Sequence, residues 1–190
     1  AITNSSMYTF EMSPVSTLIE NELINKMCSY VGYKNGFGTF VTGGSNGNLV
    51  GMLAGLFSHS PESKLNGLSS EKKFTAFVSD ESHYSFMKAG HQLGIGTNQI
   101  RRVPCDSNGR MDIQQLINLI QLSIEADEKP FFVGATAGTT VRGAFDPIGE
   151  IADVCKSFGL WFHIDGSWGG SVLLSSKHKN LIDGSKYSDS

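Results

Sequence analysis

Hydrophobic residues recur at helical spacing near the start of the chain. After Ser13 and Pro14, apolar side chains follow one another at intervals of one, three or four residues, which predicts a helix. Ser13 is suited to cap this helix and Pro14 to occupy its first turn. The apolar positions are Val15, Leu18, Ile19, Leu23, Ile24, Met27 and Val31.

From residue 38 onward, short apolar runs alternate with longer helical stretches. The short runs predict strands at residues 39–41, 74–78, 100–103, 131–135 and 160–164. The longer stretches predict helices at residues 48–57, 83–93, 111–124 and 148–158. This repeated order predicts an α/β fold with three layers, in which helices cover both faces of a mainly parallel sheet. Ligands of such a fold bind just beyond the carboxyl ends of the strands.

Composition narrows the classes of function. The 190 residues are 39% hydrophobic and 17% charged, which is typical of a globular domain, and we expect one domain. The net charge of -3, without blocks of like charge, disfavours nucleic acid and anionic membrane as partners, so a small molecule is expected instead. Neither a membrane span nor a signal peptide is expected. Cys28, Cys105 and Cys155 are far apart and lack metal-ligand spacing, which favours a cytoplasmic protein without a metal site.

A glycine-rich turn follows the first predicted strand. Gly43, Gly44 and Ser45 precede an apolar helix, so backbone N–H groups and the positive end of the helix dipole could hold a phosphate. A purely structural turn is an equal alternative, because such turns are common in α/β folds. The spacing matches neither the Walker motif nor the dinucleotide fingerprint.

Two further turns carry candidate side chains. His83 follows the strand at 74–78 and could lie against a planar ligand, or could simply cap the next helix. After the strand at 131–135, Thr139 and Thr140 are each either a backbone cap or a ligand contact. Asp146 precedes a proline and is interpreted as a structural helix cap.

Asp165 closes the last predicted strand. Its carboxylate would be partly desolvated at the carboxyl edge of the sheet and would need a partner there. A protonated pyridine nitrogen is one such partner, because the pair keeps the ring cationic and able to draw electrons from a carbanion. Capping of the following turn is the alternative.

Taken together, these turns resemble the pyridoxal-phosphate decarboxylases that act on glutamate, cysteine sulfinate and aromatic amino acids. The resemblance covers nearly the whole chain and is strongest for the branch that includes the glutamate and cysteine-sulfinate enzymes. The motifs that carry it are residues 10–15 (FEMSPV), 81–85 (ESHYS), 135–140 (ATAGTT), 143–148 (GAFDPI), 163–165 (HID) and 168–170 (WGG).

The resemblance implies a fold, a cofactor and a set of site residues. The fold would be the large domain of the fold type I, aspartate-aminotransferase-like enzymes, and the cofactor pyridoxal 5'-phosphate. Gly43, Gly44 and Ser45 would hold the phosphate, His83 would stack on the ring, and Thr140 would line its oxygen side. Asp165 would pair with the ring nitrogen, and His83 and Asp165 would be catalytic. The resemblance also implies a homodimer.

Three positions qualify this family pattern. Asn48 matches an asparagine of the glutamate branch and is expected to face the substrate. Ser167 stands where the family usually has an alanine packed on the ring face opposite the histidine, and Gly166 also replaces an alanine.

The resemblance further implies that residues 1–190 are part of the cofactor-binding large domain. The N-terminal segment, the segment with the lysine that forms the Schiff base, and the C-terminal small domain would then lie elsewhere. The family lysine is expected about seven residues past Ser190, since Lys177, Lys179 and Lys186 lie in a polar stretch.

The expected activity is decarboxylation of an acidic amino acid to an amine. Two alternatives stay open at this point. One is related chemistry on the same fold, by an aldehyde synthase or a transaminase. The other is an inactive fragment or degenerate copy that lacks the lysine.

Overall fold

The computed structural model describes residues 6–68 and 72–190, and it divides into two units, residues 1–41 and residues 42–190. Within the described residues, no helix has both the length and the apolar character needed to cross a membrane. The helices are α1 (Pro14–Val31), α2 (Gly44–His59), α3 (Ser63–Asn66), α4 (Ser85–Gln92), α5 (Ile113–Glu125) and α6 (Ile148–Phe158). The strands are β1 (Phe74–Ser79), β2 (Ile100–Val103), β3 (Lys129–Thr136) and β4 (Trp161–Asp165). Short 3₁₀ turns are η1 (Thr97–Gln99), η2 (Gly170–Leu174), η3 (Lys179–Ile182) and η4 (Ser185–Tyr187).

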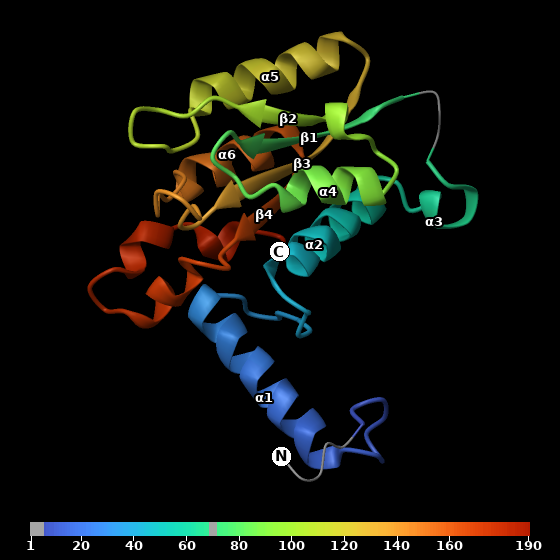
Figure 1. Ribbon diagram of the computed structural model, residues 1–190, viewed down its shortest axis with the longest axis vertical. Coiled ribbons are helices and arrows are strands. Elements are labelled where there is room, and N and C mark those ends of the chain that lie inside the picture. The colour runs from blue at the N-terminus through green and yellow to red at the C-terminus, as the bar shows by residue number, and fades with distance from the viewer. Residues whose placement is uncertain (1–5, 69–71) are drawn as a thin grey trace. The chain divides into compact units, whose positions relative to one another are not determined.

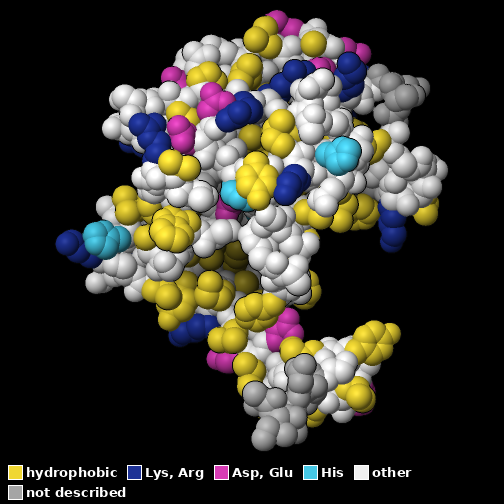
Figure 2. Space-filling view, in the orientation of Figure 1, with side chains coloured by type: hydrophobic (Ala, Val, Ile, Leu, Met, Phe, Trp, Pro, Cys, Tyr) yellow, Lys and Arg dark blue, Asp and Glu magenta, His cyan; other side chains and the backbone are white. Residues whose placement is uncertain are grey.

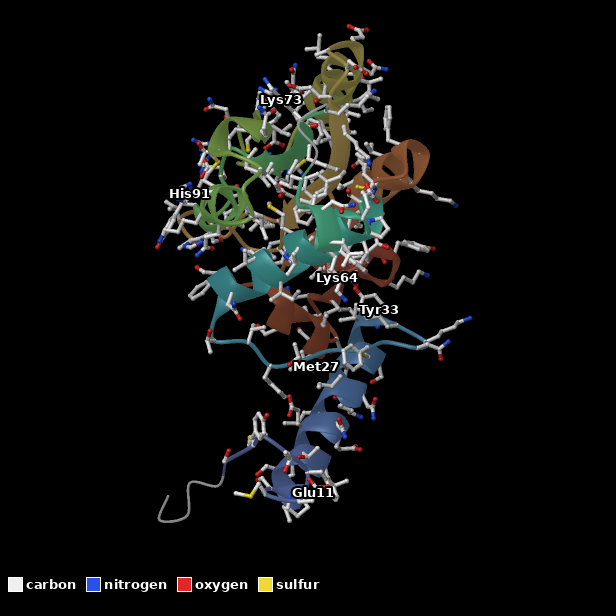
Figure 3. The ribbon with its side chains drawn as sticks, turned by 90° about the vertical axis from the view of Figure 1, so that its right-hand side faces the viewer. Glu11, Met27, Tyr33, Lys64, Lys73 and His91 are labelled. Atoms are coloured by element: carbon white, nitrogen blue, oxygen red, sulfur yellow. The ribbon has the colours of Figure 1, made fainter. Side chains whose placement is uncertain are left out.

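The first unit consists of α1 and the segments beside it. The predicted helix is confirmed, with Pro14 as its first residue, and Gly32 ends it in the left-handed conformation. No residue of α1 is buried, and hydrophobic side chains gather on the surface of this unit (Figure 2). Met27 is among the side chains that extend outward from α1 (Figure 3). The helix therefore presents an apolar stripe that its own unit does not cover.

The second unit contains a parallel sheet. Its four strands lie in the order β2-β1-β3-β4, and every neighbouring pair is parallel (Figure 1). The expected α/β sheet is thereby confirmed. The strand expected at residues 39–41 is wrong: this segment belongs to the first unit, has no regular structure, and leaves Phe40 63% exposed.

Side chains alternate between the two faces of the sheet, and each face is covered by helices. Phe77, Val133 and Phe162 pack in one core with residues of α5 and α6. Ala76, Val78 and Phe132 are part of a second core with residues of α2 and α4. Because both faces are buried, the strands are apolar at successive positions, which is why short apolar runs predicted them.

Asp146 joins the turn after β3 to the segment before α5. Its Oδ1 accepts a hydrogen bond of 2.7 Å from the Met111 N–H, and its Oδ2 accepts one of 2.7 Å from the Thr136 N–H. The expected structural role agrees with these bonds. The expected helix cap is wrong, because α6 begins at Ile148 and both carboxylate oxygens are bonded to other segments.

We predict that Asp146 makes stability depend on pH. Burial raises the pKa of Asp146 to about 6, so its contribution to stability is present below the unfolded value near 4 and is lost as pH rises through 6. Between pH 4 and pH 7, the free energy of unfolding of the parent protein should therefore fall by up to about 3 kcal/mol relative to that of the Asp146→Asn variant. Urea unfolding of both proteins measures it. A difference that does not change with pH would contradict this role for the carboxyl group.

Candidate active site

A pocket of about 280 Å³ lies at the carboxyl edge of the sheet. Its walls come from four places in the chain: the start of α2 and the turns that follow β1, β3 and β4. The lining residues are Gly44, Ser45, His83, Thr136, Gly138, Thr140, Asp165, Ser167 and Trp168. Six of the eight residues expected at the site are among them, while Gly43 and Asn48 are not.

The start of α2 forms one wall. Gly43 occupies the N-cap position of α2 with φ 114°, a conformation that strongly favours glycine. No side chain caps the N-terminus of the helix. The N–H groups of Gly44 and Ser45 are in the first turn, where a helix has no internal acceptor for them. No acidic side chain occupies this turn. The wall therefore offers free donors and a positive dipole end to an anion.

Gly44 is also where two walls of the pocket meet. A Cβ atom on Gly44 would lie 2.3 Å from Ser167 Oγ and 3.0 Å from Ser167 Cβ. The start of α2 and the turn after β4 thus approach each other too closely for any side chain at position 44.

Asp165 ends β4 and is 8% exposed. Its Oδ2 accepts a hydrogen bond of 2.8 Å from Asn48 Nδ2, and its Oδ1 accepts one of 3.0 Å from the Ser167 N–H. Both donors are neutral, and among the described residues no lysine or arginine forms an ion pair with Asp165. A buried carboxylate in this state lacks a cationic partner, and it faces the pocket.

His83 lies on the turn after β1. Its Nδ1 is 2.8 Å from Ser85 Oγ and accepts a hydrogen bond of 3.2 Å from the Ser85 N–H. Its ring lies 4.2 Å from the Tyr84 ring between centroids. The imidazole is therefore held by a side chain and a backbone group of the following helix.

The two threonines after β3 differ in role. Thr139 is fully buried, and its Oγ1 accepts a hydrogen bond of 3.1 Å from the Ala144 N–H, so it is the local backbone cap. Thr140 lines the pocket. The structure thus separates two possibilities that the sequence left open.

Asn48 is placed differently from the expectation that it faces a substrate. It is 2% exposed and does not line the pocket. Its amide is engaged by Asp165, Ser85 and His163, at 2.8, 2.8 and 2.9 Å. Both polar groups of the amide are thus engaged by neighbouring side chains.

Thr136, Gly138 and Trp168 line the pocket but were not among the expected site residues. Thr136 is the last residue of β3 and pairs in register with Asp165, which is the signal that could have found it. Its Oγ1 is buried and, within the part of the chain that the structure describes, has no hydrogen-bond partner. Thr136 thus borders the pocket, while its hydroxyl oxygen is shielded from solvent.

Comparison with known proteins gives consistent matches over the chain. A family model described as the pyridoxal-dependent decarboxylase conserved domain matches residues 1–190. Cysteine sulfinic acid decarboxylase from Mus musculus is 46% identical over 98% of this chain and 38% of the relative. Acidic amino acid decarboxylase GADL1 from Bos taurus is 44% identical over 98% of this chain and 36% of the relative. The chain therefore spans less than two-fifths of the length of these relatives.

Solved structures agree in fold. A crystal structure of mouse CSAD in apo form matches with a TM-score of 0.96 and 45% identity, over 98% of this chain and 39% of that one. A structure of Oryza sativa TDC with PLP and tryptamine matches with a TM-score of 0.86 and 25% identity, over 98% of this chain and 42% of that one. The three-layer parallel fold is that of these enzymes.

We predict energetic coupling between positions 44 and 167. Gly44→Ala should lower the free energy of unfolding by about 1–3 kcal/mol, because the new methyl group overlaps the Ser167 side chain. Ser167→Gly removes that side chain, so the double variant should recover part of the loss.

Chemical unfolding of the single and double variants measures the coupling. Gly149→Ala on α6 is the matched control, since its added Cβ would meet only Asp183 O, at 3.8 Å. Strictly additive effects of the two substitutions would refute the contact.

Proposed function

Because the chain belongs to the family of pyridoxal-dependent decarboxylases, we propose that the whole protein removes CO2 from an acidic amino acid, with pyridoxal 5'-phosphate as cofactor. Glutamate and cysteine sulfinate are the proposed substrates. The acidic class is supported by relatives named cysteine sulfinic acid decarboxylase and acidic amino acid decarboxylase. Pyridoxal phosphate, when bound, supplies a cationic ring that accepts the electrons left by the departing carboxyl group.

The observation that carries this proposal is the Asp165 carboxylate, which is buried at the pocket without a cation among the described residues. A protonated pyridine nitrogen supplies that cation. The start of α2 offers N–H donors to a phosphate. The charges of the pocket therefore fit those of the cofactor. Asp165 matches the cationic ring nitrogen, and the start of α2 matches the anionic phosphate.

Several residues at the pocket would hold the cofactor. Asp165 would keep the ring nitrogen protonated, because its carboxylate favours the charged form. Gly43, Gly44 and Ser45 bind the phosphate through their backbone and the Ser45 hydroxyl. Gly44, Ser45 and Asp165 line the pocket, whereas the assignment of Gly43 rests on its N-cap position beside them and on the family pattern.

The faces and the oxygen side of the ring are assigned in the same way. His83 would lie against one face and Ser167 against the other, while Thr140 would line the side that carries the ring oxygen. All three residues line the pocket. Together they would orient the ring.

The lysine that bonds the cofactor is proposed to lie outside residues 1–190, which form part of the large domain. None of the residues that line the pocket is a lysine, and the chain spans only 38% of its mouse relative. The proposed location is the cytoplasm, which is supported by three cysteines that are all free thiols.

We also propose that the protein is a homodimer in which α1 contributes to the interface. The support is the apolar stripe of α1: Val15, Ile19, Leu23 and Met27 are 68%, 55%, 47% and 54% exposed. Exposed apolar surface of this kind is typical of a site of association.

A test of the activity is to compare the full-length protein with its Asp165→Ala variant. Amine formation from glutamate and cysteine sulfinate should fall about 100-fold or more, because the ring loses the charge that keeps it electron-withdrawing. Asp153→Ala, an exposed aspartate on α6, is the matched control and should leave the rate unchanged.

Product analysis decides between the proposed reaction and its relatives. Amine and CO2 in equal amounts support decarboxylation, whereas aldehyde and ammonia would point to related chemistry on the same fold. An Asp165→Ala variant as active as the parent protein would refute the role of the carboxylate.

A test of the dimer is a single charge placed in the apolar stripe. Leu23→Lys should shift the full-length protein from dimer to monomer in sedimentation velocity, because burying an unpaired ammonium group is costly. Asn21→Lys adds the same charge on the opposite side of α1 and should leave the dimer intact. Equal behaviour of the two variants would contradict an interface at this stripe.

A further inference from the structure

A buried polar cluster lies directly beneath the pocket, and the proposed chemistry leaves most of it unexplained. It consists of Asn48 on α2, Ser85 at the start of α4, and His163 on β4, which are 2%, 2% and 7% exposed. It connects to Asp165 and His83, the two residues proposed to act on the ring. Buried polar groups that are fully hydrogen-bonded hold one arrangement, so the directions of these bonds decide what the cluster does.

The contact with Asp165 fixes the orientation of the Asn48 amide. An ionised carboxylate only accepts hydrogen bonds, so the atom that lies 2.8 Å from Asp165 Oδ2 must be the amide nitrogen. The second hydrogen of this nitrogen is donated to Ser85 Oγ, also at 2.8 Å. The amide oxygen is left to face His163 Nε2 at 2.9 Å, and it can only accept.

The amide oxygen in turn fixes the proton of His163. Burial lowers the pKa of His163 to about 4 against an opposing effect of Asp165, so the imidazole is neutral at pH 7 and carries one proton. That proton must be on Nε2 to be donated to Asn48. Nδ1 then accepts from the Ser190 hydroxyl at 2.9 Å, and Ser190 Oγ accepts from the Trp161 N–H at 2.8 Å. Every bond of this chain has one donor and one acceptor.

On the other side of Asn48, the direction passes through Ser85 to His83. Ser85 Oγ accepts from Asn48 and can donate its own hydrogen to His83 Nδ1 at 2.8 Å. The Ser85 N–H also donates to this nitrogen, at 3.2 Å. Nδ1 of His83 therefore carries no proton, and a neutral His83 ring has its proton on Nε2.

Packing holds the cluster in this geometry. The His163 ring stacks on Phe132 with centroids 5.6 Å apart and meets Phe86 edge-on at 6.0 Å. On α2, one turn beyond Asn48, a Cβ atom at Gly51 would lie 2.5 Å from His163 Nδ1. The absence of a side chain at Gly51 lets α2 approach β4 closely enough for the Asn48 amide to reach His163 and Asp165.

We propose that Asn48 is the positioning residue of the site, that Asp165 and His163 together hold its amide in one orientation, and that Asn48 in turn positions both Asp165 and His83. Through one N–H it holds the carboxylate for the ring nitrogen. Through the other it fixes the Ser85 hydroxyl, which together with the Ser85 N–H keeps the His83 proton on Nε2. This inference rests on the proposed roles of Asp165 and His83. A single amide group would then position both Asp165, at the edge of the ring, and His83, at one of its faces.

The first test reads the His83 tautomer in the full-length protein without cofactor, labelled with ¹⁵N-histidine. In the parent protein, the His83 signals should show a bare Nδ1 and a protonated Nε2. Asn48→Leu and Ser85→Ala should each shift the Nδ1 signal, since they loosen or remove the hydroxyl donor to Nδ1, whereas the backbone N–H of residue 85 still keeps the proton on Nε2. A parent spectrum with a proton on Nδ1, or an unchanged spectrum in both variants, would overturn the proposal.

The second test measures the dissociation constant of pyridoxal 5'-phosphate, with a matched pair of substitutions at position 163. The amide nitrogen of His163→Gln corresponds to Nε2 and keeps the donor to Asn48, whereas that of His163→Asn corresponds to Nδ1 and loses it. His163→Asn should weaken cofactor binding about 10-fold more than His163→Gln, and Asn48→Leu should weaken it about 10- to 100-fold.

A control separates this role from simple loss of stability. Thr75→Val on β1 breaks a buried hydrogen bond of 2.9 Å to Ser123 Oγ away from the pocket. It should lower the free energy of unfolding while leaving the His83 signals and the cofactor affinity unchanged. Equal cofactor affinities for His163→Gln and His163→Asn, or a loss in Asn48→Leu no larger than in Thr75→Val, would refute the positioning role.

The two readouts also distinguish this inference from the proposed function. If the parent protein binds no pyridoxal phosphate, the proposed function fails, yet the tautomer of His83 in the cofactor-free protein still decides the hydrogen-bond directions. If the cofactor binds and the His83 pattern is the opposite one, the proposed function stands and the positioning role of Asn48 is wrong.

Discussion

A carboxylate taken out of water must be compensated, and the compensation of Asp165 organises this part of the molecule. Its two protein donors, the Asn48 amide and the Ser167 N–H, are neutral and come from α2 and from the turn after β4. These bonds satisfy part of the carboxylate but leave its charge without a cation among the described residues. The pocket at this point is therefore matched to a ligand that carries positive charge.

The sequence predicted the sheet well because both of its faces are buried. Strands covered on two sides become continuous apolar runs, and the turns between these runs and the helices are where site residues collect in a parallel sheet. This reasoning located Asp165, His83 and the start of α2. It failed at residues 39–41, which pair with no strand in the part of the chain that the structure describes, and local preference alone does not make a sheet.

The role of Asn48 could not be predicted from the sequence for a different reason. Its partners Asp165 and His163 are 117 and 115 residues away, and its third partner Ser85 is 37 residues away. No local pattern records such contacts. His163 was read as part of an apolar strand, and only its alternation with Asp165 along β4 hints that both side chains reach the same face. Ser167, by contrast, was noticed as a departure from alanine, and its hydroxyl is accommodated because Gly44 opposite has no side chain.

The pocket is assembled from four turns that are spread over more than a hundred residues of the chain. A ligand that binds there recognises only the fully folded arrangement, so its binding free energy is added to the stability of the entire sheet unit. Local opening of any one of the four turns must release the ligand, and proteases act on such opened states. Supply of the bound ligand would thus govern how long the protein survives in a cell as well as how fast it works.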